Sequence, residues 1–219
     1  ASIQSAVTSA RSAKTPEQQA QMLGIVAQDV QRLDRLITDI ARASRIETET
    51  AKLDLNQVDL GALLFELTRA YASPPDEPAP VAITFSGVKP EGLFVMGQAG
   101  PIGQVFRNLI DNARSFSPQG GVVRVSATIE RSKDGAVVRA VVDDQGPGIP
   151  PENLETIFER FYTQRPKGTA FGGNSGLGLS IARQIVTSYG GRIYAQNRDG
   201  LGRADGGGAR LIVELPLAH

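Results

Sequence analysis

Three separated segments of the chain contain residue types whose spacing could bind a ligand. The first holds Asn108 and Asn112, which lie four residues apart within a helical pattern, so their side chains share one face of the helix. Two such amides could serve as neutral oxygen ligands, because a hard cation such as Mg²⁺ is held by a few protein oxygens together with phosphate oxygens and water. Capping or buried hydrogen bonding explains the pair equally well when it is taken alone.

The second segment runs from Val142 to Ile149 and reads VDDQGPGI. A strand that ends in Asp-x-Gly-x-Gly places the carboxylate of Asp144 at the strand end, and the glycines let the backbone approach a flat ligand closely. A buried carboxylate that accepts a hydrogen bond from an exocyclic amine would select adenine over guanine. An ordinary Asp-Gly turn is the alternative interpretation.

The third segment, Gly172–Leu179, reads GGNSGLGL and opens onto a helical pattern at Ser180–Tyr189. Glycines at a helix N-terminus expose backbone N–H groups, and the helix dipole favours anions there, so the pattern indicates a phosphate site. It is neither a Walker loop nor a Rossmann turn, because no Gly-Lys-Ser/Thr follows and no strand leads directly into it. A flexible loop with a glycine-rich cap is the alternative.

Composition excludes several other kinds of site. The 219 residues contain no cysteine and one histidine, His219, which we expect to be a tag remnant or a frayed end. Disulfides, thiol catalysis, thiolate metal sites and an internal histidine triad are therefore excluded. Lys+Arg and Asp+Glu number 23 each, so bulk charge indicates no nucleic-acid surface. No apolar run approaches the ~20 residues that span a bilayer and no signal peptide opens the chain, which predicts a soluble chain.

The elements that must position these segments follow a long helical region. Apolar side chains recur every three or four residues over Glu17–Ile46, and Thr15, Pro16 and Gln18 form a helix start with a capping box. A shorter helical pattern comes before, so we expect an antiparallel hairpin whose first arm has lost its beginning. It could pair with a second copy into a four-helix bundle, or pack on the rest of the chain. We predict one domain over residues 1–48 and another over 49–219.

Strand and helix patterns are mixed in the second domain. Asp59 is expected to cap the helix that carries Leu60 to Tyr71, and further helices are expected near Ile102–Ser115 and Leu177–Tyr189. Strands are expected at Leu53–Val58, Val81–Phe85, Leu93–Met96, Val122–Glu130, Ala136–Asp143, Arg192–Asn197 and Ala209–Leu215. This order predicts an α+β fold: a two-layer α/β sandwich with a mixed sheet and helices on one face, preceded by the helical hairpin.

The order of the three segments, with Ile157–Tyr162 (IFERFY) between the last two, resembles the N, G1, F and G2 boxes of sensor histidine kinases. These kinases share an ATPase superfamily with gyrase, Hsp90 and MutL. The GLGLSI helix start, the closing Glu214-Leu215-Pro216 and the hairpin, which is similar to the dimerization and histidine-phosphotransfer domain, favour the kinase branch. The resemblance covers nearly the whole chain and leans weakly toward the ChvG-type sensors.

The resemblance implies a site for ATP and Mg²⁺. Asn112, with Asn108 beside it, would ligate Mg²⁺, Asp144 would accept from the adenine amine, and Phe116 would stack on adenine. Residues from about Ile149 to Ser175 would form an ATP lid, with Phe158 and Phe161 as anchors and with Arg160, Arg165 and Lys167 as candidates for phosphate contact or lid docking. The full set of implied ATP-binding residues is Asn108, Asn112, Arg114, Ser115, Phe116, Asp144, Gly146, Gly148, Ile149, Phe161, Arg165, Lys167, Gly173, Ser175, Gly176, Leu177, Gly178 and Leu179.

Two departures from the family pattern stand out. The family frequently has a Lys at the Ser115 position, and Arg114 beside it points to another helix face. The phosphoacceptor histidine would lie a few residues before Ala1, so the chain as given should bind ATP without phosphorylating itself, and no catalytic residue is assigned.

The resemblance implies an ATP-dependent protein-histidine kinase core. It would form a homodimer through the hairpin, pass the phosphoryl group to an aspartate of a response regulator, bind no nucleic acid, and lie on the cytoplasmic side of an inner-membrane sensor whose membrane segments are absent from this sequence. The alternatives are a non-catalytic nucleotide-binding signalling scaffold, and a serine kinase or other ATPase of the same superfamily.

Overall fold

The computed structural model describes residues 15, 18, 20, 24, 55–71, 81–86, 92–132, 135–162, 176–198 and 207–218. Most of the expected hairpin over residues 1–48 lies outside them, so its architecture and its pairing with a second copy stay predictions. At its start, Thr15 Oγ1 accepts a hydrogen bond from the N–H of Gln18 at 3.3 Å, as expected of a helix cap. None of the helices in the described part of the chain is both long and apolar enough to cross a membrane.

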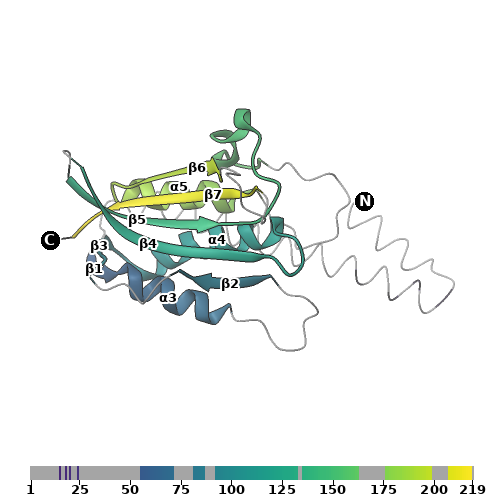
Figure 1. Cartoon of the computed structure of the whole chain (residues 1–219), viewed down its shortest axis with the longest axis horizontal. Helices are drawn as coiled ribbons and strands as arrows, with labels where there is room; N and C mark the ends of the chain where they lie inside the picture. Colours follow the sequence, from purple (N-terminus) through teal and green to yellow (C-terminus); the bar gives the residue numbers. More distant parts are fainter. Residues whose placement is uncertain are drawn as a thin grey trace.

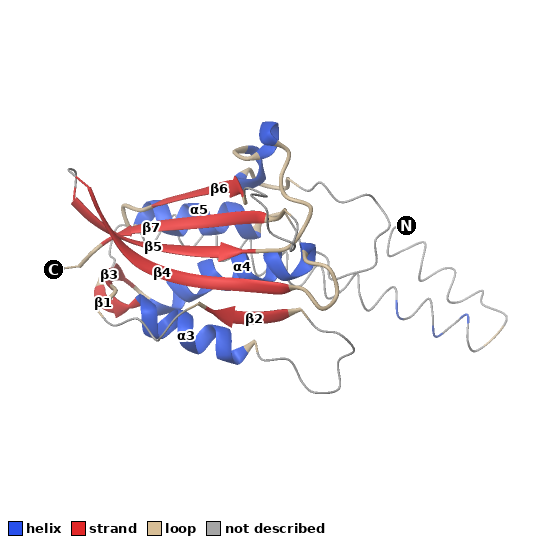
Figure 2. Cartoon of the chain, in the orientation of Figure 1, coloured by secondary structure: helices blue, strands red, loops and turns tan. Residues whose placement is uncertain are grey.

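One mixed sheet with helices on one face forms the body of the molecule (Figures 1 and 2). Its strands lie in the order β2-β4-β5-β7-β6; β2 pairs with β4 in parallel and the other neighbours are antiparallel. A separate two-stranded antiparallel sheet joins β1 to β3. The strands are β1 Asn56–Asp59, β2 Ala82–Phe85, β3 Phe94–Gly97, β4 Val122–Ser132, β5 Gly135–Asp143, β6 Arg192–Asn197 and β7 Ala209–Pro216.

In the described part of the chain three α-helices cover the sheet, and the two-layer sandwich predicted from the sequence is confirmed. They are α3 Leu60–Ala70, α4 Ala99–Phe116 and α5 Gly178–Ser188, with two short 3₁₀ turns, η2 Pro151–Asn153 and η3 Thr156–Phe158, between β5 and α5. In Figure 1, α4 and α5 lie behind the strands. Asp59 caps α3 as expected, because its Oδ1 accepts from the N–H of Ala62 at 2.9 Å.

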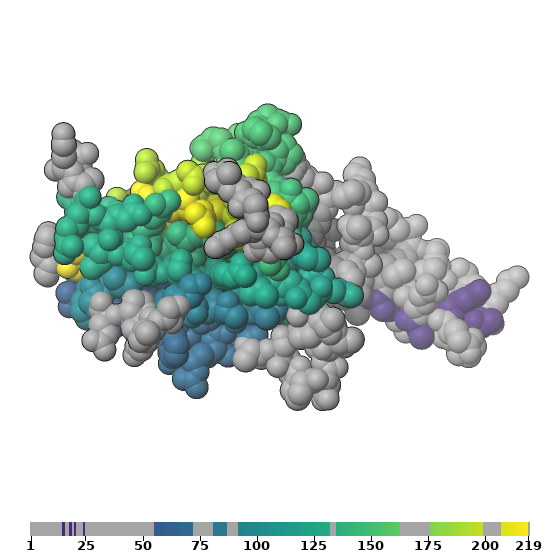
Figure 3. All heavy atoms as spheres, viewed as in Figure 1, coloured from purple at the N-terminus to yellow at the C-terminus, as the bar shows by residue number. Residues whose placement is uncertain are grey.

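The alternation of side chains along the strands explains this layering. Along β5, β7 and β6, alternate residues are apolar and buried against the apolar stripes of α4 and α5; these residues are Val138, Ala140, Val142, Leu211, Val213, Leu215, Ile193 and Ala195. The residues between them face the other side, which Figure 3 views directly, with β4 and β5 in teal and β7 in yellow. There Glu214 accepts from Arg192 Nη2 at 2.9 Å and from Tyr194 Oη at 2.6 Å.

The helix α4 begins earlier than the sequence pattern indicated. Its first residue is Ala99 rather than Ile102, so Pro101 lies in the first turn. Proline is tolerated there, because the first N–H groups of a helix have no intrahelical partner. The apolar stripe of Val105, Leu109 and Ile110 was predicted correctly, since all three side chains are buried. Because this stripe packs against the core, the face of α4 that carries the two asparagines points away from the core.

Candidate functional site

The end of α4 and the Asp-x-Gly-x-Gly segment are joined directly. Ser117 Oγ accepts from the N–H of Gln145 at 3.4 Å and donates to the carbonyl of Ala113 at 2.9 Å. A Cβ on Gly146 would lie 2.9 Å from the carbonyl oxygen of Phe116, so only glycine fits this close approach. The first and second candidate segments are therefore adjacent in the fold.

Asp144 is the only acidic residue among the buried polar side chains of the described residues, at 4% exposure. Its Oδ1 accepts from the N–H groups of Gly146 and Ala209, each at 2.8 Å. Within the described part of the chain no donor reaches Oδ2, so this oxygen can accept from a ligand. Burial raises the pKa of Asp144, and the two N–H groups and the charge of Arg198 partly oppose that rise.

The Gly148–Ile149 backbone is fixed to the end of β6. Asn197 Oδ1 accepts from the N–H of Ile149 at 2.7 Å, and Asn197 Nδ2 donates to the carbonyl of Ile149 at 2.7 Å. Gly148 has φ +81°, and a Cβ there would lie 2.9 Å from Asn197 Oδ1. A side chain at residue 148 would therefore be strained and would also displace the asparagine.

The helix α4 also reaches the glycine-rich segment. Asn108 Nδ2 donates to the carbonyl of Gly178 at 2.9 Å and so holds the first residue of α5. Buried hydrogen bonding, the alternative considered for this pair, therefore accounts for part of the role of Asn108. Asn112 is half-buried one turn later on α4, and its side-chain amide forms no hydrogen bond with the residues that the structure describes. The two asparagines thus differ: one ties elements together and the other presents an open amide.

Among the described residues, no side chain caps the start of α5. The residue before the helix is Leu177, which offers no capping group. Gly176, at φ +72°, accepts at its carbonyl from the N–H of Phe161 at 3.0 Å, and a Cβ on Gly176 would come within 2.8 Å of the Tyr162 carbonyl oxygen. An uncapped N-terminus beside glycine is suited to an anion.

The two phenylalanines of the IFERFY segment have different environments. Phe158 is buried at 3% exposure; the guanidinium of Arg183 lies 4.3 Å from its ring centroid and pairs with Glu155 at 2.6 Å. Phe158 therefore anchors this segment to α5. Phe161 is 65% exposed and has φ 66°, a conformation that is uncommon for a bulky residue.

Two further predicted residues lie at the end of α4. Phe116 is 39% exposed, which fits a stacking surface, and its carbonyl oxygen would lie 2.9 Å from a Cβ on Gly146. Ser115 Oγ donates to the carbonyl of Asn112 at 2.8 Å. Arg165, Lys167, Gly173 and Ser175 lie outside the described residues, so their roles stay predictions.

Sequence reasoning missed the residues that support Asp144 from behind. They are Arg198, which donates to the Asp144 carbonyl, and Gly208, where a Cβ would lie 2.2 Å from the same oxygen; the role of Asn197 in holding Ile149 was missed as well. The glycine run around position 207 was the one local signal, and only the strand order brings it to Asp144.

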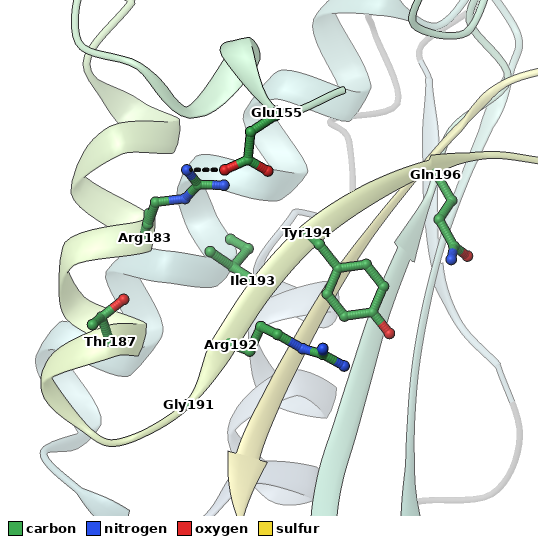
Figure 4. Close-up of a pocket in the computed structure, with 8 residues that line it drawn as sticks. All are labelled: Glu155, Arg183, Thr187, Gly191, Arg192, Ile193, Tyr194 and Gln196. Carbon is green, nitrogen blue, oxygen red and sulfur yellow. Dashed lines mark hydrogen bonds and ion pairs between the residues drawn. The ribbon is translucent and has the colours of Figure 1, made fainter. Parts of the chain in front are cut away.

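A separate pocket of about 650 Å³ opens between α5 and β6 (Figure 4). Its charged side chains are already paired, since Arg183 binds Glu155 and Arg192 binds Glu214. None of the predicted site residues lines it. The convergence at Asp144, Asn112 and the start of α5 is therefore the better candidate site.

Comparison with known proteins agrees with this geometry. The family described as "Histidine kinase-, DNA gyrase B-, and HSP90-like ATPase" matches residues 97–219. The sensor protein ChvG of Rhizobium meliloti is 42% identical over 98% of this chain, and ChvG of Agrobacterium fabrum is 42% identical over all of it. This chain spans 37% of the length of each of these relatives.

Solved structures give the same result. The catalytic domain of histidine kinase ThkA is 27% identical with a TM-score of 0.58, over 75% of this chain and 99% of that domain. The mycobacterial sensor histidine kinase MprB is 28% identical with a TM-score of 0.56, over 74% of this chain and 97% of the other. Since the family match alone covers more than half of the sequence and includes all three segments of the site, the chain belongs to the histidine kinase-, DNA gyrase B- and HSP90-like ATPase family.

Proposed function

We propose that this chain is the ATP-binding core of a sensor histidine kinase, which binds Mg-ATP and supplies the γ-phosphoryl group to a histidine outside the given sequence. The observation that carries the proposal is the convergence of an open carboxylate oxygen on Asp144, an open amide on Asn112 and the uncapped start of α5 around the end of α4. The ChvG relatives, which are named as sensor proteins, support the same assignment.

Asp144 recognises the adenine end of the nucleotide in this proposal. The N–H groups of Gly146 and Ala209 hold Oδ1, so the carboxylate has one fixed orientation and Oδ2 is directed to the ligand. An exocyclic amine donates to that oxygen, whereas the carbonyl that guanine carries there would leave two acceptors facing each other. The exposed ring of Phe116 supplies the stacking surface.

Asn112, Asn108 and the start of α5 hold the phosphate end. Among the described residues there is no cluster of three or more acidic, histidine or cysteine side chains that could bind a metal by itself. This donor set fits Mg²⁺, which is commonly bound by one or two protein oxygens together with substrate phosphates. The ion would neutralise the phosphate charge, and the chain would orient the nucleotide and exclude water.

We extend the proposal to the rest of the family pattern. Residues 1–48 form the dimerization and phosphotransfer hairpin, residues 49–219 form the catalytic domain, and a response regulator receives the phosphoryl group. ThkA, a structural relative, has been crystallised in complex with the response regulator TrrA. Membrane attachment would come from segments outside this sequence.

A non-catalytic nucleotide-binding scaffold is the second candidate, and the observation that favours it is at Ser115. The family frequently has a lysine at this position. The hydroxyl of Ser115 instead donates to the carbonyl of Asn112, and the side chain has no charge that could bind phosphate. A kinase transfers phosphate to a separately supplied histidine-bearing domain, whereas a scaffold binds ATP without transfer.

Calorimetry of the chain with Mg-ATP and Mg-GTP tests the proposal. We expect binding of ATP but not of GTP, and Asp144→Ala should weaken ATP binding by about tenfold or more, because it leaves the adenine amine without an acceptor. Glu66→Ala, which removes an exposed carboxylate on α3 whose side chain is 66% exposed, is the matched control and should bind as the parent does. Equal ATP affinity of the parent and Asp144→Ala would contradict the adenine assignment.

A further inference from the structure

An arginine with a largely enclosed side chain contacts Asp144 of the candidate adenine site, and the proposed function assigns it no role. Arg198 follows the last residue of β6, and its side chain is only 10% exposed. Burying a guanidinium is costly unless it is paired and hydrogen-bonded, so its partners indicate what it stabilises.

The guanidinium of Arg198 contacts both aspartates at the end of β5. Its Nη1 donates to the main-chain carbonyl of Asp144 at 2.8 Å, and its Nε lies 3.9 Å from Oδ2 of Asp143. Arg210 binds the same Asp143 carboxylate through two hydrogen bonds of 2.7 and 2.8 Å. Two guanidinium groups therefore lie beside the Asp143 carboxylate, and one of them, that of Arg198, also holds the Asp144 carbonyl.

Main-chain hydrogen bonds near Arg198 join the ends of the same strands. Its N–H donates to the carbonyl of Gly208 at 2.9 Å, and the N–H of Asp144 donates to the carbonyl of Ala209 at 3.0 Å. The N–H of Ala209 in turn donates to Oδ1 of Asp144 at 2.8 Å. The ends of β5, β6 and β7 are thus joined through Asp144, and Arg198 is the side chain that spans them.

The charges around Asp144 oppose one another. From β5, Asp143 favours protonation of Asp144, and from the end of β6, Arg198 favours its ionised form. From β7, Arg210 acts on Asp143, with which it pairs. Without Arg198, only the N–H groups of Gly146 and Ala209 would oppose burial and the like charge of Asp143, so the pKa of Asp144 would rise further.

We propose that Arg198 is a positioning residue for adenine-nucleotide binding, which acts through the Asp144 carbonyl and the Asp143 carboxylate to keep the Asp144 carboxylate oriented and ionised. A protonated Asp144 would present a hydroxyl donor where the adenine amine also donates. The inference rests on the proposed function, because it takes Asp144 as the acceptor for adenine.

The test uses Arg198→Gln, Arg198→Lys and the control Arg192→Gln, which removes a cation from the other end of β6. The carboxyl titration of Asp144, followed by ¹³C NMR without nucleotide, should move to higher pH in Arg198→Gln and return toward the parent in Arg198→Lys. The affinity for ADP at neutral pH should fall by about tenfold in Arg198→Gln. This is the loss expected when the charged acceptor on Asp144 no longer receives the hydrogen bond of the adenine amine. Arg192→Gln should change neither quantity.

An unchanged Asp144 titration in Arg198→Gln would overturn the inference, even if the variant were less stable. If Arg198→Gln does not fold, Asp143→Asn is compared with Asp143→Asn/Arg198→Gln, which removes the carboxylate together with its cation; the same upward movement is expected, and equal titrations contradict it. Failure of the parent to bind any adenine nucleotide would instead refute the proposed function, while the titration still decides on Arg198.

Discussion

At the scale of single residues, Asp144 combines a binding role with a cost in stability. Burial raises the pKa of its carboxyl, and the hydrogen bonds from Ala209 and Gly146 and the charge of Arg198 compensate only in part. Because the pKa is higher in the folded chain than in the unfolded chain, the folded chain binds more protons between the two values. The stability contributed by this group is therefore present at low pH and is lost as pH rises through that window.

This sign leads to a prediction for Asp144→Asn. The amide keeps an oxygen that can accept from the N–H groups of Gly146 and Ala209 but carries no charge, so the variant should unfold at a higher temperature than the parent at neutral pH. Its advantage should shrink as pH falls and the parent carboxyl becomes protonated. Thermal unfolding from acid to neutral pH, combined with calorimetry for ATP, measures both effects; we expect ATP binding to be lost. A variant that binds ATP normally, or whose advantage grows toward acid pH, would contradict this explanation.

The two asparagines of α4 give a second residue-scale prediction, because only one of them joins two elements. Asn108→Ala removes the hydrogen bond to the Gly178 carbonyl and should destabilise the chain by about 1 kcal/mol as well as weaken nucleotide binding. Asn112→Ala should leave the stability within about 0.5 kcal/mol of the parent and abolish the Mg²⁺ dependence of ATP binding. Denaturant unfolding and calorimetry with and without Mg²⁺ separate the two. Equal destabilisation by both substitutions would remove the distinction between them.

At the scale of elements, the helix-free face of the sheet carries a charge network around Glu214 that contains none of the candidate site residues. Burial by itself would raise the pKa of Glu214, but hydrogen bonds from Tyr194 and Arg192 and the charges of Arg192 and Arg139 more than offset it, so the pKa is lowered. The network joins β5, β6 and β7, the same strands whose opposite ends meet at Asp144.

Glu214→Gln should therefore destabilise the chain by about 1 kcal/mol at neutral pH. Since the pKa of Glu214 is lower in the folded chain, its contribution is present above the unfolded-state value and disappears as pH falls through the folded-state value. Denaturant unfolding at neutral and acid pH should show the difference between variant and parent closing on acidification. We expect ATP binding by Glu214→Gln to equal that of the parent. A stability difference that does not depend on pH would mean that the charge of Glu214 contributes nothing to stability.

At the scale of the whole molecule, the sequence predicted the elements better than the junctions between them. The strand β6 was predicted with its observed bounds, and the cap at Asp59 was predicted because an N-cap is a local pattern. The roles of Arg198 and Asn197 could not be predicted, because they depend on β7 lying between β5 and β6. Phe158 was grouped with Phe161 by sequence proximity, and only the position of α5 shows that one is core and the other is exposed.

The candidate site, like the fold, could be predicted from the sequence only in part. Asp144, Gly146 and Asn112 were identified from residue type and spacing, since their chemistry is local. That Asn108 would bind Gly178 across the fold depends on how α4 packs on α5, and no local pattern contains this information. What a sequence carries most directly is the chemistry of short segments, and what it carries least directly is their support by distant strands.

A crystal structure of the chain with Mg²⁺ and a nonhydrolysable ATP analogue tests the central claim most directly. The account predicts an adenine amine against Oδ2 of Asp144, phosphates at the start of α5 and the metal at the side-chain oxygen of Asn112. Nucleotide density in the pocket between α5 and β6, or no density at a saturating concentration of the analogue, would contradict it.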